Sequence, residues 1–240
     1  NISYPDDGNA LCFDFEDNSF WFQHRNNCIL HLINLFPPTG VLLDIGGGNG
    51  YVAQRILAEG FPVILLEPGS TGAKNANLYR KLPEVINSTF EDAGFPDESI
   101  SAVGIFDVLE HIENDRIFLR EIWRIMKPGG RLYATFPAHN FLWSASDTYA
   151  LHHRRYNRQT INQIAEQLFE LKYFSYFFSI LTLPTLLIRV LPYHLRKSKP
   201  DGKPSNFEFG IGGGKLVDFL SFFLDQELKR IMSGKVVPYG

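Results

Sequence analysis

Residues 41–50 read Val-Leu-Leu-Asp-Ile-Gly-Gly-Gly-Asn-Gly, an apolar run with one carboxylate, Asp44, followed by a glycine-rich turn. The apolar run predicts a buried strand, and the glycines predict a sharp turn in which no Cβ keeps a ligand away from the backbone. Apolar residues then recur at helical spacing from Val52 to Leu57, so the turn opens onto a helix N-terminus. A strand, a glycine turn and a helix in this order predict a ligand-binding loop.

The spacing of the glycines narrows the kind of ligand. A dinucleotide fingerprint requires Gly-x-Gly-x-x-Gly, but the bulky Tyr51 stands where the third glycine belongs. No Gly-Lys-Ser or Gly-Lys-Thr follows, so the loop is not a phosphate-binding P-loop. What remains is Asp-x-Gly-x-Gly-x-Gly, whose buried carboxylate would repel a phosphate and attract an ammonium or sulfonium group.

A second acidic residue follows the next apolar run. Residues 62–66 predict a strand that ends at Glu67, the position at which a βαβ unit accepts hydrogen bonds from ribose hydroxyls. Further on, a helix predicted over 115–126 ends at Lys-Pro-Gly-Gly, and a fifth strand follows it. With these motifs in this order, the chain resembles the class I S-adenosylmethionine-dependent methyltransferases over at least residues 20–137.

The resemblance implies S-adenosyl-L-methionine as cofactor and S-adenosyl-L-homocysteine as product. In that family the glycine loop holds the methionine part and the second-strand acid holds the ribose. The family's adenine-binding acid falls at Thr89 in our register, with Phe90 next, although Glu91 or Asp92 could supply the acid if the loop is shifted. The cofactor residues that the resemblance implies are Trp21, Arg25, Asp44, Gly46, Gly47, Gly48, Asn49, Gly50, Glu67, Pro68, Thr89, Phe90 and Asp107.

Trp21 and Arg25 are included because a Phe-Trp-Phe-x-x-Arg arm precedes the glycine loop in one branch of the family. There the arm would close over the cofactor, and Arg25 could meet its carboxylate. The alternative is a helix that simply packs on the edge of the sheet.

Two further segments carry candidate acceptor-binding and catalytic residues. The strand predicted over 101–106 delivers a Leu-Glu-His-Ile run to the ligand edge of the sheet, and the loop from Trp143 to Tyr156 follows the fifth strand. A His-x-Arg-Arg-Tyr loop forms the substrate wall in the branch that the chain resembles, although Leu151 replaces the usual glycine before the first histidine. The candidates are Asp107, His111, Asp147, His152, Arg155 and Tyr156.

Each of these candidates also has a purely structural interpretation. Asp107 would cap the following turn, and Glu110 would face solvent. Arg154 and Arg155 would form a solvated basic face, and Tyr156 would pack at a helix start. The adjacent His152 and His153 invite a metal site, but neighbouring side chains diverge and no third His, Cys or acid lies at ligand spacing, so we expect no metal.

Composition limits the partners and the compartment. The 240 residues include 23 basic and 26 acidic side chains, for a net charge of −3, so we expect no nucleic-acid substrate. Two cysteines without metal or redox spacing and no recognisable leader favour the cytoplasm. The apolar residues 179–191 are too short to span a bilayer, but with nearby basic residues they allow peripheral contact with a membrane or a lipid-linked substrate.

These observations predict one α/β domain, residues 1–240, with a doubly wound, mostly parallel sheet of the seven-stranded type whose last strand is short or absent. We expect an N-terminal arm and helix (1–38), a cofactor-binding core (39–140), and a substrate loop with a C-terminal helical lid (141–240). Within these parts the patterns predict a loosely held segment 1–18, a strand at 173–178, a mobile segment 198–214, and helices at 160–171 and 215–232.

The predicted function is methyl transfer from S-adenosylmethionine to a small-molecule, glycan or lipid-linked acceptor. Two alternatives stay open at this point. One is a non-catalytic protein that only binds S-adenosylmethionine, and the other is an NAD-dependent oxidoreductase, which Tyr51 disfavours.

Overall fold

The computed structural model describes residues 8–195 and 215–240. The strands are β1 (Leu42–Ile45), β2 (Val63–Leu66), β3 (Val85–Ile86), β4 (Ile100–Phe106) and β5 (Met126–Thr135). The helices are α1 (Gly8–Glu16), α2 (Phe20–Leu35), α3 (Tyr51–Ala58), α4 (Ser70–Leu78), α5 (Asp115–Ile125), α6 (Ala145–Tyr149), α7 (Arg158–Ala165), α8 (Ser179–Thr185), α9 (Leu191–His194) and α10 (Lys215–Met232). Short 3-10 turns cover Leu109–His111 and Asn140–Leu142, and a π-helical turn covers Leu186–Val190.

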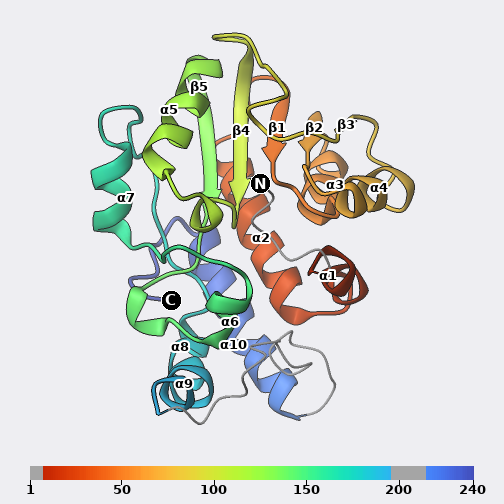
Figure 1. Cartoon of the computed structure of the whole chain (residues 1–240). Helices are drawn as coiled ribbons and strands as arrows, with labels where there is room; N and C mark the ends of the chain where they lie inside the picture. Colours follow the sequence, from red (N-terminus) through yellow and green to blue (C-terminus); the bar gives the residue numbers. More distant parts are fainter. Residues whose placement is uncertain (1–7, 196–214) are drawn as a thin grey trace.

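The strands form one parallel sheet in the order β3-β2-β1-β4-β5 (Figure 1). In its register Leu42 pairs with both Val63 and Ala102, so β1 lies at the centre. The chain winds outward from β1 to β3 and then returns to β4 on the other side of β1. Ligands bind at the carboxyl edge of such a sheet, at this reversal of strand order. The α/β doubly wound class predicted from the sequence is confirmed.

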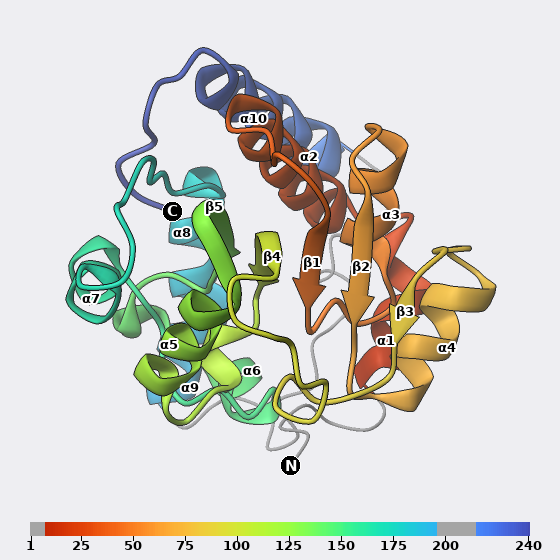
Figure 2. The same cartoon turned by 90° about the horizontal axis from the view of Figure 1, so that it is seen from above.

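Helices cover both faces of the sheet, as the view from above shows (Figure 2). Because side chains alternate along a strand, Leu42 and Leu65 pack toward α2 and α3, whereas Leu43 and Ile105 pack toward α5 and α7. The two apolar layers hold the five strands in register, and they leave the residues at the strand ends to face the ligand edge. They account for the near-continuous apolar runs that predicted the strands.

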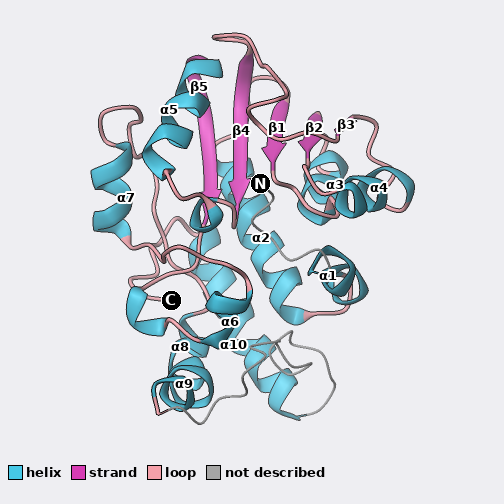
Figure 3. Cartoon of the chain, viewed as in Figure 1, coloured by secondary structure: helices cyan, strands magenta, loops and turns pink. Residues whose placement is uncertain are grey.

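Several predictions for the outer segments were wrong. Residues 8–16 form helix α1 rather than a loosely held arm, and residues 173–178 are loop rather than strand (Figure 3). The described residues therefore contain five strands, fewer than the family's seven. Helix α7 ends at Ala165, several residues earlier than predicted. The segment 198–214, predicted to be mobile, lies outside the described residues.

The loop at 173–178 is held by isolated hydrogen bonds rather than by the repeated backbone hydrogen bonds of a strand. Tyr176 N donates to Val237 O over 3.1 Å, and Val237 N donates to the Ser175 hydroxyl over 2.9 Å. A repeated backbone ladder is what defines a strand, so one backbone bond with one side-chain bond leaves this pair of segments irregular. The aromatic run at 173–178 predicted a strand, whereas the structure has half-buried residues without a ladder.

Glu227 joins three segments that are distant in sequence. It lies on α10, and its carboxylate accepts from the backbone N–H groups of Phe178 and Ser179, at the start of α8, over 2.6 and 2.8 Å. The same carboxylate lies 3.0 Å from His24 Nε2 on α2, and both side chains are 5% exposed. Helix α2, which leads into the site, is therefore fixed by the last helix of the chain.

Around α8 and α9 the surface is apolar. Leu183, Leu187 and Ile188 are each more than half exposed. Across residues 8–195 and 215–240, however, we find no helix with both the length and the apolar character required to cross a bilayer.

We expect Glu227→Ala to lower the free energy of unfolding by about 2–4 kcal/mol, because the buried His24 and two partly buried backbone donors lose their acceptor. Urea unfolding followed by circular dichroism would measure the change. Asp225→Ala, an exposed position on the same helix, is the matched control and should change the free energy by less than about 0.5 kcal/mol. Equal midpoints for the two variants would contradict the role of Glu227.

Candidate cofactor and acceptor site

The glycine loop lies directly after β1 and is shaped by contacts that exclude side chains. A Cβ on Gly47 would lie 2.6 Å from Leu65 Cδ1 and 2.7 Å from Asp44 Oδ2. Gly50 adopts a left-handed φ of 80° at the N-cap of α3, and a Cβ there would lie 2.9 Å from the Cβ of Ala76. Backbone, rather than side chains, therefore forms the wall of the site at this point.

Asp44 is fully buried beneath this loop. Neither carboxylate oxygen has a hydrogen-bond partner within the described residues. Burial raises the pKa of Asp44 to about 7; the nearby Arg25 lowers it and Glu67 raises it further. A buried carboxylate without donors is costly unless a proton or a cationic ligand compensates for it, so Asp44 is suited to a ligand that brings an ammonium group.

Glu67 sits at the end of β2 and holds two backbone turns together. Its carboxylate accepts from Gly48 N over 2.9 Å and from Gly69 N over 2.8 Å. Burial raises its pKa, although these backbone bonds act in the opposite direction. A carboxylate oxygen can accept more than one hydrogen bond, so both oxygens retain capacity for the hydroxyls of a ribose.

The predicted arm residues reach the same edge of the sheet. Arg25, on α2, donates from Nε to Asp107 Oδ2 over 2.6 Å, while Thr135 on β5 donates to Asp107 Oδ1 over 3.0 Å. Trp21 stacks on Phe178, with ring centroids 5.2 Å apart and planes 10° apart. The partner of Arg25 in this structure is thus a carboxylate of the protein itself, and contact with the cofactor's carboxylate stays a prediction.

The predicted adenine position lies in the loop after β3. Thr89 donates from its hydroxyl to Asp92 over 2.8 Å, and the ring of Phe90 packs 5.4 Å from that of Phe118. Thr89, Phe90 and Glu91 line the cavity described below. A neighbouring side chain that the sequence analysis missed, Asn87, donates to the backbone oxygens of Glu67 and Pro68 over 2.8 and 3.0 Å and so fixes this loop to β2.

Asp147 is the hub of the predicted acceptor loop. It is 1% exposed and accepts from Ser144 N over 2.8 Å, from Arg155 Nε over 2.7 Å and from Arg155 Nη2 over 3.0 Å. It also accepts from the Ser144 hydroxyl over 3.2 Å, and His152 Nδ1 lies 3.0 Å away. Burial alone would raise the pKa of Asp147, but the hydrogen bonds from His152 and Arg155 outweigh it and lower the pKa. Asp147 is therefore a fixed anion that orients two side chains.

His152 in turn meets the segment after β4. Its ring packs edge-on against that of His111, with centroids 4.7 Å apart. Burial, and then His152, lower the pKa of His111 to about 4, so His111 is neutral at pH 7. The adjacent Glu110 is 1% exposed, and burial followed by repulsion from Asp107 raises its pKa. Glu110 does not face solvent, which corrects the structural interpretation considered from the sequence.

Tyr156 has partners inside the protein core. Its side chain is 3% exposed, and its hydroxyl contacts Leu109 O over 3.2 Å and Asp115 Oδ2 over 3.0 Å. Burial raises its pKa, as does the charge of Asp115. These contacts fix the loop at 152–156 to the start of α5. A direct catalytic role for Tyr156 stays a prediction, but its position favours support of the loop.

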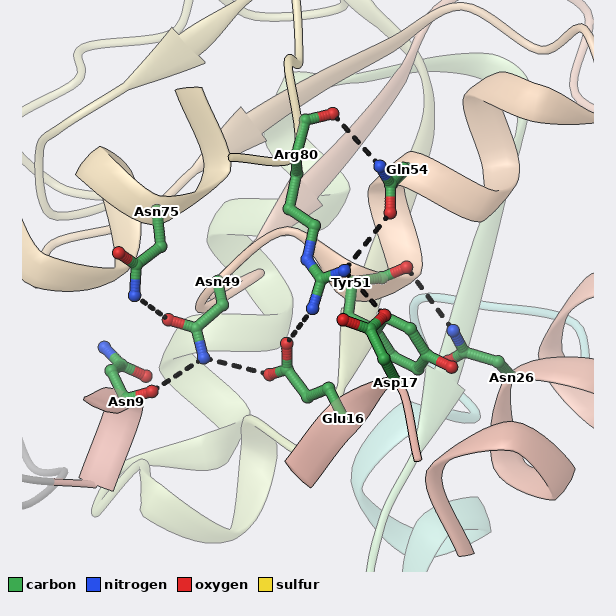
Figure 4. Close-up of polar contacts among 9 residues, drawn as sticks. All are labelled: Asn9, Glu16, Asp17, Asn26, Asn49, Tyr51, Gln54, Asn75 and Arg80. Carbon is green, nitrogen blue, oxygen red and sulfur yellow. Dashed lines mark hydrogen bonds and ion pairs between the residues drawn. The ribbon is translucent and has the colours of Figure 1, made fainter. Parts of the chain in front are cut away.

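A polar network over the glycine loop was not foreseen from the sequence (Figure 4). Asn49 donates from Nδ2 to the backbone oxygen of Asn9 over 2.8 Å and to Glu16 over 2.9 Å, and it accepts from Asn75 over 2.9 Å. Arg80 donates to the second oxygen of Glu16 over 3.0 Å. The network attaches α1 to the loop. Its one visible signal in the sequence is Asn49, an amide side chain set between loop glycines.

Of the cofactor and acceptor residues predicted from the sequence, all except Gly50 line one cavity of about 2130 Å³. One end is formed by the glycine loop, Asp44 and Glu67, the middle by Asp107, and the other end by the loop at 142–156 and by α8. The structure thus brings the predicted cofactor residues and the predicted acceptor residues to one continuous space.

Comparison with known proteins agrees with this geometry. Residues 43–134, which run from β1 into β5, match the family described as "Methyltransferase domain". These residues form a class I S-adenosylmethionine-dependent methyltransferase domain.

The methyltransferase relatives resemble only part of the chain. A probable S-adenosylmethionine-dependent methyltransferase of Mycobacterium tuberculosis is 25% identical over 124 residues, which are 52% of this chain and 45% of that protein. A ubiquinone biosynthesis O-methyltransferase of Rickettsia conorii is 30% identical over 93 residues, or 37% of this chain and 32% of that protein. The matched segments therefore span less than half the length of either curated relative.

Among solved structures, a phosphoethanolamine N-methyltransferase of Haemonchus contortus, crystallised with phosphomonomethylethanolamine and S-adenosylhomocysteine, has a TM-score of 0.57 at 19% identity. The match covers 96% of this chain and 56% of that one. At this identity the comparison shows a shared fold and no more.

The residues at the first end of the cavity fit the cofactor of this family. A methionine-like ammonium matches the buried carboxylate of Asp44, the side-chain-free wall at Gly47 admits a ligand next to the backbone, and a ribose matches Glu67.

We expect Glu67→Ala to weaken S-adenosylmethionine binding by roughly 1.5–3 kcal/mol, because a charged acceptor for the ribose hydroxyls is lost and the Gly48 turn loosens. Isothermal titration calorimetry would measure the affinity. Glu84→Ala, at an exposed position before β3, is the control and should bind as the unmodified protein does. Unchanged affinity in Glu67→Ala would remove Glu67 from the ribose site.

A second expectation concerns pH. Since the pKa of Asp44 is about 7 in the free protein, the carboxyl group is largely protonated below that pH, and an ammonium ligand must displace the proton. Affinity for S-adenosylmethionine should therefore rise by up to about tenfold per unit between roughly pH 5.5 and 7. Calorimetry in two buffers of different ionisation enthalpy would reveal proton release. Asp44→Asn should bind more weakly and lose this dependence, and a flat profile in the unmodified protein would contradict the assignment.

Proposed function

We propose that the chain transfers a methyl group from S-adenosylmethionine to a hydroxyl-bearing acceptor, either a small molecule, a glycan or a lipid-linked compound. The observation that carries this proposal is the continuity of the cavity from Asp44 and Glu67, at the cofactor end, to His111 and His152 at the other. A direct transfer requires that donor and acceptor meet in one continuous space.

The cofactor, when bound, supplies a methyl group on a sulfonium that is already a strong donor. The protein then has to hold the acceptor in line with this methyl group and to keep water out. Trp21, stacked on Phe178, and Arg25, paired with Asp107, border the cavity on the side of α2.

A hydroxyl acceptor must also lose a proton during transfer, and the second end of the cavity holds the groups that can assist this loss. His152 has Nδ1 engaged by Asp147, so Nε2 is the nitrogen that remains for an acceptor. His111 contributes a neutral imidazole beside it. Asp147 is a positioning residue in this scheme, because its oxygens are taken up by Ser144, His152 and Arg155.

The walls near α8 favour an acceptor with an apolar part. Leu181, Pro184 and Ile188 line the cavity, and Ile188 is also 56% exposed on the surface. Apolar lining that continues onto an exposed apolar surface suits a ligand whose polar end is methylated while its apolar end leaves the cavity. This supports peripheral contact with lipid as part of the proposal.

We expect His152→Ala to lower turnover by about 10²-fold with its acceptor while S-adenosylmethionine affinity changes by less than about twofold, because the groups lie at opposite ends of the cavity. The assay is transfer of a radiolabelled methyl group to a panel of phenols, glycans and lipid extracts. His153→Ala, exposed and adjacent, is the control. Binding of the cofactor without any methylated product across the panel would indicate a non-catalytic binding protein instead.

A further inference from the structure

Three side chains with metal-binding atoms meet at the acceptor end of the cavity. The ligand atoms of Glu110, His111 and His152 all lie within 4.8 Å of one another. Two of these residues follow β4 and the third comes from the loop after α6, so the fold rather than a local sequence motif brings them together. No third ligand lies near His152 and His153 along the chain, and for this reason the sequence alone predicted no metal.

The charges around this cluster leave one carboxylate without a counter-ion. Arg25 is paired with Asp107 at 2.6 Å, and Arg155 is paired with Asp147 at 2.7 Å. Within each pair the two charges balance, so neither arginine compensates Glu110, which is 1% exposed. Its Oε2 atom is buried and has no hydrogen-bond partner among the described residues. A carboxylate in this position is stable only if a proton or a cation accompanies it.

His152 is oriented as metal-binding histidines usually are. Its Nδ1 atom contacts the Asp147 carboxylate at 3.0 Å, and that carboxylate is itself fixed by Ser144 N and Arg155. A carboxylate behind a histidine fixes the ring and directs the other nitrogen to the ion. Asp147 would therefore orient the metal ligand His152 and also hold the loop in place.

We propose that Glu110, His111 and His152 bind one divalent transition-metal ion, for which Zn²⁺ is the first candidate, with Asp147 as the residue that positions His152. Two imidazoles and one carboxylate are the ligand set of catalytic zinc sites that keep an open position. Mg²⁺ and Ca²⁺ prefer oxygen ligands throughout and fit this set poorly.

This site deepens the proposed function and rests on it only for its role. With an ion bound, His111 and His152 would act as its ligands rather than on the acceptor directly. The ion would bind the acceptor hydroxyl and lower its pKa, the proton would pass to solvent, and the methyl group would then move to the oxygen and leave S-adenosylhomocysteine. The existence of the site itself can be tested without any acceptor.

The experiment uses the full chain, freed of any affinity tag, stripped with a chelator and then titrated with Zn²⁺ by calorimetry and with Co²⁺ by visible absorption. We expect about one ion per chain and the absorption bands of four- or five-coordinate Co²⁺. Glu110→Gln and His152→Ala should each weaken binding by at least about 100-fold, and Asp147→Asn by about 10- to 100-fold. His153→Ala should bind as the unmodified protein does.

Glu110→Gln and His152→Ala test the site independently. His152 is partly exposed, so its replacement leaves the buried Glu110 in place and should not unfold the protein. Retention of S-adenosylmethionine binding in each variant shows that the cofactor end is intact. Unchanged metal binding in Glu110→Gln and His152→Ala, an equal loss in His153→Ala, or no saturable binding by the unmodified protein would overturn the site. Metal binding without any methyl transfer would support the site and refute the proposed function.

Discussion

Four carboxylates share the carboxyl edge of the sheet, and the cost of placing them there governs the site. Asp44, Glu67 and Glu110 are almost completely buried, and Asp107 is only partly exposed. Removing a charge from water is unfavourable unless donors or counter-ions replace the water. Asp107 has Arg25 and Glu67 has two backbone amides, whereas Asp44 and Glu110 have no equivalent partner for every oxygen among the described residues.

The four carboxylates therefore fall into two groups with different roles. The two satisfied carboxylates fix protein segments to each other, since Asp107 joins α2 to β5 and Glu67 joins two turns. The two incompletely satisfied carboxylates lower stability in the ligand-free protein, and a cationic ligand could recover that energy on binding. Strain of this kind is typical of binding sites, where the fold maintains groups that would be unfavourable elsewhere.

The central elements were predictable because their signals are local. An apolar run before the turn at 46–50, the acid at Glu67 and the Lys-Pro-Gly-Gly stop each depend on neighbours within a few residues. Helix α1 was missed because its apolar residues do not gather on one face and because it is attached through Arg80 and Asn49, far along the chain. The burial of Glu110 was missed for the same reason: the loop at 152–156 covers it, and only the fold places that loop there.

The junction between His24 and Glu227 has a consequence for how the protein is made. The two residues are separated by 203 positions, so α2 leaves the ribosome long before its partner α10 is synthesised. A nascent chain can form the central strands early, but it carries the arm that bears Trp21 and Arg25 without its final support. Closing so long a loop is slow and entropically costly, so the binding end of the molecule should mature only after α10 has emerged from the ribosome.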